Sequence, residues 1–246
     1  MKKGKLIAID GIDGSGKATQ VKLLAERLKK EGFKVKAIDF PRYYDNFFGK
    51  LIGEYLSGLY GDFTEVDPRI GSLLYAADRF ESSKDIKKWL DDGYIVLSDR
   101  YTSANEIHQG GKIFNQQARR EFLVWLEKME YGVFNIPKPD LTILLDVPFE
   151  VSKHWLENKI TRRSKKYLKG RRDVAEDNLR YLKTSRECSL WLAIHNKTWA
   201  KIECCKGMVC MSPDEVGQKV FEIVKKKINL AYYGNKTKNK KIKSRG

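Results

Sequence analysis

The sequence predicts an α/β fold in three layers, with a five-stranded parallel sheet and helices on both of its faces. Short apolar runs alternate with helical patterns along the chain, which favours right-handed crossovers between parallel strands. A glycine-rich loop joins the first apolar run, residues 6–10, to the first helical pattern. The chain has 246 residues, 41% of them hydrophobic, which is enough for one large domain with a full core.

Five apolar runs have the composition of buried strands. They span residues 6–10, 33–40, 94–99, 141–147 and, more weakly, 199–205. Helical patterns lie between them, at residues 17–31, 46–57, 67–91, 115–131, 149–160, 173–197 and 213–229. Asp67-Pro68 is typical of a helix start, and Asp91-Asp92-Gly93 is typical of a helix end. We expect a single domain over residues 1–230 and a basic, disordered tail over residues 231–246.

The net charge of +16 is concentrated in two segments. Residues 235–246 carry six positive charges, and residues 161–172 carry seven with no acidic residue. Such a charge fits nucleic acid, but it also fits an enzyme whose substrates are polyanionic nucleotides. A non-catalytic, basic nucleic-acid-binding protein therefore stays open as a second hypothesis, although we expect no specific nucleic acid partner.

No apolar run approaches the length of a membrane span, and the run after Met1–Lys5 is too short for a signal peptide. We therefore expect a cytoplasmic protein without a membrane partner. Neither a C-x-x-C pair nor a histidine spacing typical of zinc occurs around the four cysteines, Cys188, Cys204, Cys205 and Cys210. We expect all four to be free thiols.

Gly11, Gly16 and Lys17 have the spacing of a phosphate-binding loop, G-x-x-x-x-G-K, between a strand and a helix. The glycines let backbone N–H groups converge on one anion, and the helix start adds its positive dipole end. Lys17 supplies a mobile charge for the β- and γ-phosphates. Ala18 stands where a hydroxyl ordinarily holds Mg²⁺, so either phosphates, water and a carboxylate elsewhere hold the ion, or the loop is catalytically weakened. We do not expect Thr19 to replace it, because its side chain lies about 100° further around the helix.

Other candidate residues follow the strands or share a helix face. Asp99 and Arg100 end the third apolar run, where nucleotide-binding sheets place a carboxylate for Mg²⁺ and where a guanidinium can bind phosphate. Tyr75 and Arg79 are four residues apart, so their ring and guanidinium can stack on a base and hydrogen-bond its edge. These residues also have structural interpretations. Arg100 could form a surface ion pair, and Tyr75 and Arg79 could pack against each other on the helix. Asp13 alone is typical of a turn.

Together these motifs resemble those of the thymidylate kinase family, whose members phosphorylate dTMP with ATP in dTTP synthesis. The resemblance covers residues 5 to about 230. It depends on Gly11-Ile-Asp-Gly-Ser-Gly-Lys-Ala-Thr-Gln20, Phe40-Pro-Arg-Tyr43, Leu74-Tyr-Ala-Ala-Asp-Arg79, Asp99-Arg-Tyr101 with Asn105 and Gln109-Gly-Gly111, Pro137-Lys-Pro-Asp-Leu141, and Leu145-Asp-Val-Pro148. Asp173-Val-Ala-Glu-Asp177 adds a weaker match. The resemblance implies the fold of P-loop nucleoside monophosphate kinases and a homodimer.

The resemblance also implies a role for each matching residue. ATP would lie on Gly11, Gly14, Ser15, Gly16, Lys17, Ala18 and Thr19. The dTMP site would comprise Asp13, Phe40, Arg42, Tyr43, Tyr75, Arg79, Arg100, Asn105, His108, Gln109 and Asp173. Arg100 would bind the phosphate of dTMP, with Arg42 or Tyr43 near it, and Asp13 would face that phosphate and the sugar 3′-hydroxyl. Tyr75 would stack on the base, while Arg79 and Asn105 would contact its O4 and N3 edge. Asp99 would hold Mg²⁺ directly or through water.

A basic lid closes over the ATP phosphates in this family, and here it would span about residues 159–173. Gly14 stands where some members carry a catalytic arginine, so the lid would supply that charge. The lid candidates are Arg162, Arg163, Arg171 and Arg172. The catalytic set would comprise Asp13, Lys17 and Arg100, together with Arg163 and Arg171 from the lid. His108 stands where members often have an aromatic residue near the sugar 2′ position.

The sequence thus predicts reversible transfer of the ATP γ-phosphoryl group to dTMP. We expect dUMP to be a poorer substrate and dCMP to be nearly inert. A kinase of the same fold for UMP, CMP or a deoxynucleoside stays open as the close alternative, and Arg79, Asn105 and His108 are the residues that distinguish it.

Overall fold

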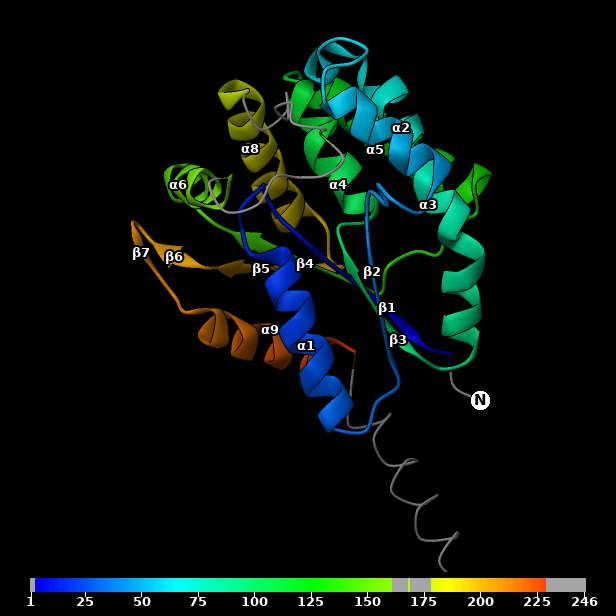
Figure 1. Cartoon of the computed structure of the whole chain (residues 1–246), viewed down its shortest axis with the longest axis vertical. Helices are drawn as coiled ribbons and strands as arrows, with labels where there is room; N and C mark the ends of the chain where they lie inside the picture. The colour runs from blue at the N-terminus through cyan, green and yellow to red at the C-terminus, as the bar shows by residue number, and fades with distance from the viewer. Residues whose placement is uncertain (1–2, 161–167, 169–177, 229–246) are drawn as a thin grey trace, which may run out of the picture.

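A computed structural model describes residues 3–160, 168 and 178–228, without the side chains of residues 156–160. Five parallel strands form one sheet in the order β2–β3–β1–β4–β5 (Figure 1). The strands are β1 Lys5–Asp10, β2 Val35–Asp39, β3 Ile95–Asp99, β4 Leu141–Asp146 and β5 Trp199–Glu203. Each overlaps the apolar run that predicted it, so the predicted sheet is confirmed.

The helices follow the predicted alternation with the strands. They are α1 Lys17–Lys30, α2 Phe47–Leu56, α3 Pro68–Asp91, α4 Thr102–His108, α5 Gln116–Glu127, α6 Phe149–Ile160, α8 Leu179–His195 and α9 Pro213–Lys227. Shorter turns are η1 Phe63–Glu65, η2 Gly110–Lys112 and the π-helical η3 Lys128–Val133. The predicted start of α3 is confirmed, because the Asp67 carboxylate accepts a hydrogen bond from the Arg69 N–H at 2.8 Å.

Alternate side chains of β1 point to opposite faces of the sheet, as the two-residue repeat of a strand requires. Ile7 and Ile9 pack in a core with α1 and α9, whereas Leu6 and Ala8 pack in a core with α3. Over β4 and β5, that second face is covered by α4 and α8. Figure 1 shows α1 and α9 side by side on the first face. The carboxyl ends of the strands share one edge, where β1 to β4 each end in an aspartate.

A short antiparallel hairpin, which no sequence pattern predicted, follows β5. It consists of β6 Cys205–Lys206 and β7 Val209–Cys210. The register places Cys205 opposite Cys210, and the two form a disulfide, so the expectation of four free thiols is wrong. The pairing of strands that brings the two sulfurs together was missed, because neither strand is longer than two residues. Cys188 and Cys204 are free and buried.

Two predicted segments lie largely or wholly outside the described residues. These are the lid, about residues 159–173, and the tail, residues 231–246. In the part of the chain that the structure describes, no helix is both long enough and apolar enough to cross a membrane.

Candidate active site

The loop between β1 and α1 has the geometry that its glycines predict. Gly11, Gly14 and Gly16 have φ angles of 151°, 81° and 90°, which glycine adopts without a steric penalty. A Cβ on Gly11 would lie 2.7 Å from both Ser15 Oγ and the Leu145 carbonyl oxygen. No side chain among the described residues caps the start of α1 at Gly16, so the N–H groups of its first turn suit an anion.

Lys17 lies inside this loop, with 7% of its surface exposed. Its Nζ donates to the carbonyl oxygens of Gly11 at 3.0 Å and Ile12 at 2.9 Å. Burial, and then the charge of Arg100, lower the pKa of Lys17, while nearby carboxylates oppose the shift. The loop therefore holds its ammonium group at the place where phosphates would bind.

Arg100 directly follows β3 and lies in the left-handed region, with φ of 61°. Its N–H donates to the Ile9 carbonyl at 3.0 Å, which fixes it beside the start of the loop. The guanidinium forms an ion pair with Asp13 and lies 3.6 Å from Asp10 Oδ1. Burial disfavours its charge, but Asp13 and then Asp10 more than offset this and raise the pKa of Arg100 above its ordinary value. The predicted residues Asp13 and Arg100 are thus brought together.

Asp10 joins the loop to α4. The fully buried carboxylate accepts hydrogen bonds from the Gly11 N–H at 2.8 Å and from Ser103 Oγ at 2.7 Å. From the sequence, Asp10 is only one of four acids at strand ends. The structure shows that it positions the phosphate loop and α4 relative to one another.

Asp99 is the residue best placed to hold a divalent cation. It ends β3 near Lys17 and Arg100, and burial raises the pKa of Asp99 while those two cations oppose the shift. Within the described residues nothing hydrogen-bonds its carboxylate, and a carboxylate oxygen is a ligand that Mg²⁺ prefers. Ala18 and Thr19 are exposed beside the loop, and Ala18 carries no oxygen on its side chain.

The described residues contain no group of three or more His, Cys, Asp or Glu side chains that could hold a metal ion. Asp99 therefore fits Mg²⁺ only as a single protein ligand. Substrate phosphates and water would have to complete the coordination.

His108 contacts Arg100 from the carboxyl end of α4. Its Nε2 lies 3.0 Å from Arg100 Nη1 and accepts that N–H, so the ring is neutral and Nδ1 carries the proton. Burial, and then the charge of Arg100, lower the pKa of His108 to about 3. The ring stacks on Tyr181 with centroids 5.8 Å apart and 24° between the planes. His108 therefore contributes a neutral aromatic ring at this site.

The segment after β2 is held in place by Asp78 of α3. Asp78 Oδ2 accepts from the Arg42 N–H at 3.1 Å, and Asp78 Oδ1 accepts from Asn46 Nδ2 at 2.9 Å. The Arg42 guanidinium itself pairs with Asp45 at 2.6 Å. Burial raises the pKa of Asp78, while the hydrogen bonds from Arg42 and Asn46 oppose the shift. α3 thus fixes the backbone of the predicted phosphate-binding segment.

The aromatic candidates belong to two hydrophobic clusters. Tyr75 packs edge-to-face on Phe63, with centroids 5.6 Å apart, and Tyr43 packs against the same hydrophobic cluster. Phe40 is buried in another cluster, where its ring lies 5.8 Å from that of Tyr101. Phe40 therefore packs in a different cluster from Tyr43 and Tyr75.

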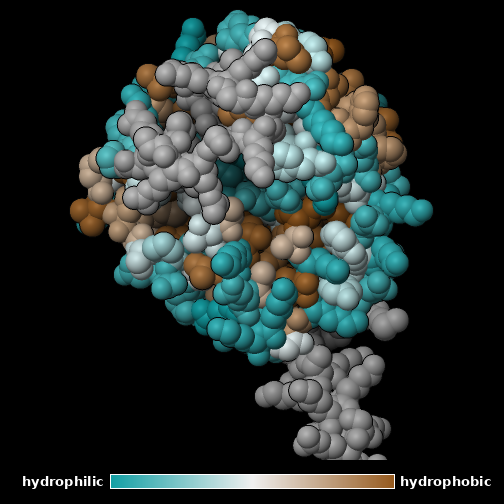
Figure 2. Space-filling view, in the orientation of Figure 1, coloured by the Kyte–Doolittle hydropathy of each residue, from teal (hydrophilic) through white to brown (hydrophobic). Residues whose placement is uncertain are grey.

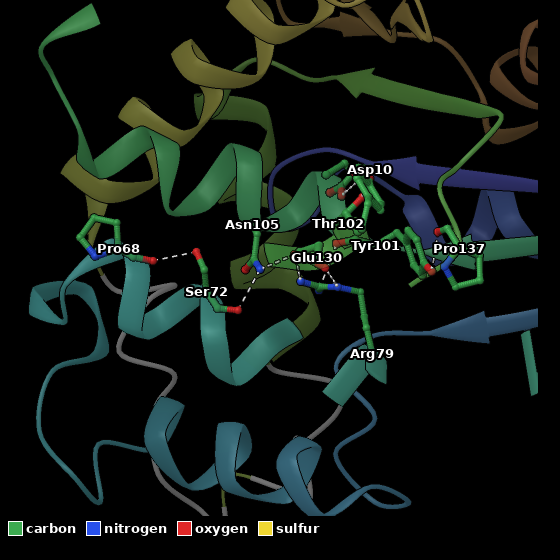
Figure 3. A network of polar contacts seen from close by, with 11 residues as sticks. Asp10, Pro68, Ser72, Arg79, Tyr101, Thr102, Asn105, Glu130 and Pro137 are labelled. Atoms are coloured by element: carbon green, nitrogen blue, oxygen red, sulfur yellow. Dashed lines mark hydrogen bonds and ion pairs between the residues drawn. The ribbon is translucent and has the colours of Figure 1, made fainter. Parts of the chain in front are cut away.

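Arg79, Asn105 and Glu130 form a buried polar network (Figure 3). Arg79 Nε donates to Glu130 Oε2 at 2.9 Å, and Arg79 Nη2 donates to Glu130 Oε1 at 2.5 Å. Asn105 Nδ2 donates to the same Glu130 Oε1 at 2.8 Å. Burial would lower the pKa of Arg79, but Glu130 more than offsets this and raises it. Two residues predicted to contact the base thus share one carboxylate.

Gln109 is fully buried at the end of α4 and lies against Gly71 of α3. Neither atom of its side-chain amide has a hydrogen-bond partner among the described residues. The lid candidates Arg162, Arg163, Arg171 and Arg172, together with Asp173, lie outside the described residues.

Sequence reasoning missed Glu130, because a glutamate near the end of an amphipathic helix ordinarily faces solvent. Its partner Arg79 lies 51 positions away in the sequence, and no local pattern joins them. One signal could have indicated a buried carboxylate. Arg79 lies on a helix that packs against the sheet, and a guanidinium buried there requires a carboxylate partner. No spacing in the sequence identifies that partner as Glu130.

The arrangement places two cationic centres at adjacent strand ends. Lys17 lies in the loop after β1, and Arg100 lies after β3, which pairs with β1 so that Ile9 is opposite Asp99. Backbone carbonyls of the loop hold Lys17, and the carboxylates of Asp13 and Asp10 hold Arg100. Such a site can bind two phosphate groups side by side and neutralise the charge that develops between them.

The chain is similar to proteins of one family over most of its length. The family model for thymidylate kinase matches residues 9–206. A probable thymidylate kinase from Archaeoglobus fulgidus is 32% identical over 231 residues, which cover 94% of this chain and 100% of the relative. Another, from Pyrobaculum aerophilum, is 34% identical over 171 residues, which cover 69% of this chain and 79% of the relative. A solved thymidylate kinase structure from Candida albicans matches with a TM-score of 0.67 and 26% identity, over 92% of this chain and 93% of that one.

Proposed function

Because the chain belongs to the thymidylate kinase family, it is a phosphotransferase that acts on dTMP, and we propose that the groups at the ends of β1 and β3 carry out the transfer from ATP. The pair of cationic centres, Lys17 and Arg100, is the observation that carries this proposal. The acceptor phosphate is ionised at neutral pH, so no general base is required. The protein must instead bring two polyanions together and offset their charge.

Each cation has a proposed partner. The loop from Gly11 to Gly16 and Lys17 bind the ATP phosphates, and Lys17 exchanges the loop carbonyls that it now contacts for phosphate oxygens. Arg100 binds the phosphate of dTMP, for which it exchanges part of its contact with Asp13. Arg163 and Arg171 of the predicted lid add positive charge over the transferred group.

Mg²⁺ is the proposed cofactor, with Asp99 as its protein ligand, directly or through water. The ion would supply positive charge that offsets the negative charge on phosphate oxygens. Asp99 fits this role because its carboxylate lies at the phosphate loop without a hydrogen bond from any described residue. Because Ala18 has no hydroxyl, phosphate oxygens and water would supply the ligand that a Ser or Thr provides in other phosphate-binding loops.

Arg79 and Asn105 are the proposed base readers, with Tyr75 against the base. Loss of the thymine methyl group weakens binding by about 0.8 kcal/mol, so dUMP should react only a few-fold less well. Cytosine presents the wrong hydrogen-bonding groups to Arg79 and Asn105. Sites that hydrogen-bond their substrate in this way can reject the wrong one on the order of 10⁴-fold.

A second copy of the chain is the proposed partner. Ile70, Leu73 and Phe80 lie at helical spacing on α3 and are 57%, 44% and 51% exposed, and Phe47 of α2 is 70% exposed. Figure 2 shows hydrophobic residues at the edge of the molecule where Figure 1 places α2 and α3. An exposed apolar helix face that is identical in both copies suits a twofold interface.

The activity is tested by ADP release from ATP–Mg²⁺ with dTMP, dUMP, UMP and dCMP supplied one at a time. We expect preferential turnover of dTMP, at roughly 1–100 s⁻¹. Lys17→Met should abolish turnover, whereas Lys22→Met, an exposed lysine of the same helix, should not change it. Turnover of another acceptor alone would contradict the base assignments, and absence of any turnover would contradict the kinase assignment.

A further inference from the structure

The network around Glu130 determines which hydrogen-bonding atoms Asn105 and Arg79 present to a ligand. Glu130 and Arg79 are each 1% exposed and Asn105 is 2% exposed, so water cannot exchange freely for any of these partners. A buried carboxylate accepts hydrogen bonds and donates none. Whatever faces Glu130 must therefore do so through its N–H groups.

Asn105 is fixed in one orientation by two acceptors. Its Nδ2 donates to Glu130 Oε1 at 2.8 Å and to the Ser72 carbonyl at 3.1 Å (Figure 3). Both N–H groups of the amide are thus used within the protein. The atom left is Oδ1, which has no hydrogen bond among the described residues and can only accept one.

Arg79 is fixed with the opposite polarity. Its Nε and Nη2 donate to the two oxygens of Glu130, and its Nη1 donates to the Tyr101 carbonyl at 3.2 Å. A guanidinium has five N–H groups and no acceptor, so the remaining N–H groups can only donate. Within the pair, Asn105 therefore has only an acceptor unused, and Arg79 has only donors unused.

We propose that Glu130 is a positioning residue that sets the base specificity of this enzyme, because it makes Asn105 an acceptor and holds Arg79 as a donor. The inference rests on the proposed function. Thymine and uracil carry N3–H, a donor, next to the 4-carbonyl, an acceptor, and so match the pair at both positions. Cytosine has an acceptor at N3 and a donor at its 4-amino group, and so mismatches both. The network thus selects pyrimidines by the groups at positions 3 and 4.

The test is Glu130→Gln, with kcat/KM measured for dTMP, dUMP and dCMP. An amide at this position can donate to Asn105 Oδ1, so the Asn105 amide loses its single orientation. We expect the preference for dTMP over dCMP to fall at least about tenfold. The preference for dTMP over dUMP should stay within about twofold of the parent value, because both bases carry the same edge. A ratio within one preparation does not depend on the fraction of folded enzyme.

Glu127→Gln is the matched control. Glu127 ends α5, is exposed and pairs with exposed Lys138, so its variant should keep both ratios of the parent enzyme. Where Glu130→Gln does not fold, Glu130→Asp keeps the charge with a shorter reach and should lower the same dTMP-to-dCMP ratio. An unchanged ratio in a folded Glu130 variant would overturn the inference.

Failure of the proposed function gives a different result. In that case the parent enzyme would not turn over dTMP at all. The same three nucleotides are then compared by calorimetric binding to the parent and to the Glu130 variant. An equal loss of affinity for all three nucleotides would overturn the positioning role of Glu130. A gain in affinity for dCMP relative to dTMP would support it.

Discussion

Arg100 shows how a single residue can be held in an unfavourable conformation at a functional site. A left-handed backbone at a non-glycine residue typically destabilises a fold by about 1–3 kcal/mol. Here the surroundings compensate, because the Arg100 N–H bonds to the Ile9 carbonyl and Ser98 Oγ bonds to the Arg100 carbonyl. The conformation turns the chain sharply after β3 and keeps the guanidinium beside the phosphate loop. Arg100 thus combines a strained backbone with a side chain that has the clearest proposed role in the site.

Glu106 is a residue whose charge state should make stability depend on pH. Burial, and then the charges of Glu130, Glu127 and Asp10, raise the pKa of Glu106 to about 8, with Lys138 opposing. It lines a cavity of about 280 Å³ that includes none of the phosphate-loop residues. Above the ordinary carboxyl pKa the unfolded chain has released this proton while the folded chain still holds it. The free energy of unfolding therefore falls as pH rises toward about 8.

Glu106→Gln removes this titration. We expect the variant to gain stability relative to the parent as pH rises from about 5 to about 8, by at most about 1.4 kcal/mol per pH unit. Urea unfolding at several pH values measures the difference. Glu187→Gln, an exposed glutamate of α8, should follow the parent curve. Parallel curves for the parent and Glu106→Gln would show that Glu106 titrates normally.

At the scale of the element, α3 connects two parts of the proposed acceptor site. Asp78 holds the segment that carries Arg42, and its neighbour Arg79 holds Glu130. Asp78→Asn keeps the shape of the side chain but replaces one acceptor oxygen with a donor, so either the Arg42 N–H loses its acceptor or Asn46 Nδ2 loses one of its three acceptors. We expect KM for dTMP to rise at least about fivefold, while KM for ATP changes by less than about twofold.

Steady-state kinetics with each substrate varied in turn checks this prediction. Asp85→Asn changes an exposed aspartate of the same helix and should leave both constants at their parent values. An equal rise of both KM values in Asp78→Asn would mean that α3 supports the whole fold and not the acceptor side.

Elements with a strong local signal could be predicted from the sequence. The strands were found because continuous apolar runs are typical of parallel sheets buried on both faces, and α3 was found because Asp67-Pro68 caps its start. The helix α4, Thr102–His108, was missed because it is short, polar and directly follows a strand. The Cys205–Cys210 hairpin and the Glu130 network were missed for another reason, since both depend on pairings that only the folded chain brings together.

At the scale of the whole molecule, the apolar face on α2 and α3 predicts self-association. We expect the parent chain to have twice the chain mass of 28.5 kDa in solution. Leu73→Asp places a charge in the centre of the proposed interface and should yield monomers, because an unpaired charge disfavours burial there. Light scattering coupled to size-exclusion chromatography measures both masses.

Ile194→Asp is the control for surface hydrophobicity. Ile194 is 79% exposed on α8, outside the proposed interface, so this variant should retain the mass of the parent. A parent protein of single-chain mass at micromolar concentration would contradict the dimer.

The carboxylates around Arg100 should also lower the affinity of its guanidinium for small anions. Arg100 is already paired with Asp13 and lies close to Asp10, so an incoming anion gains only an exchange of one negative partner for another. Inorganic phosphate, sulfate or chloride brings no further contact and so gains little from that exchange. A nucleotide bound as proposed would add contacts through its sugar and its base, and those contacts would favour its binding at Arg100. In a chain with a net charge of +16, this local neutralisation should lower the affinity of Arg100 itself for simple anions.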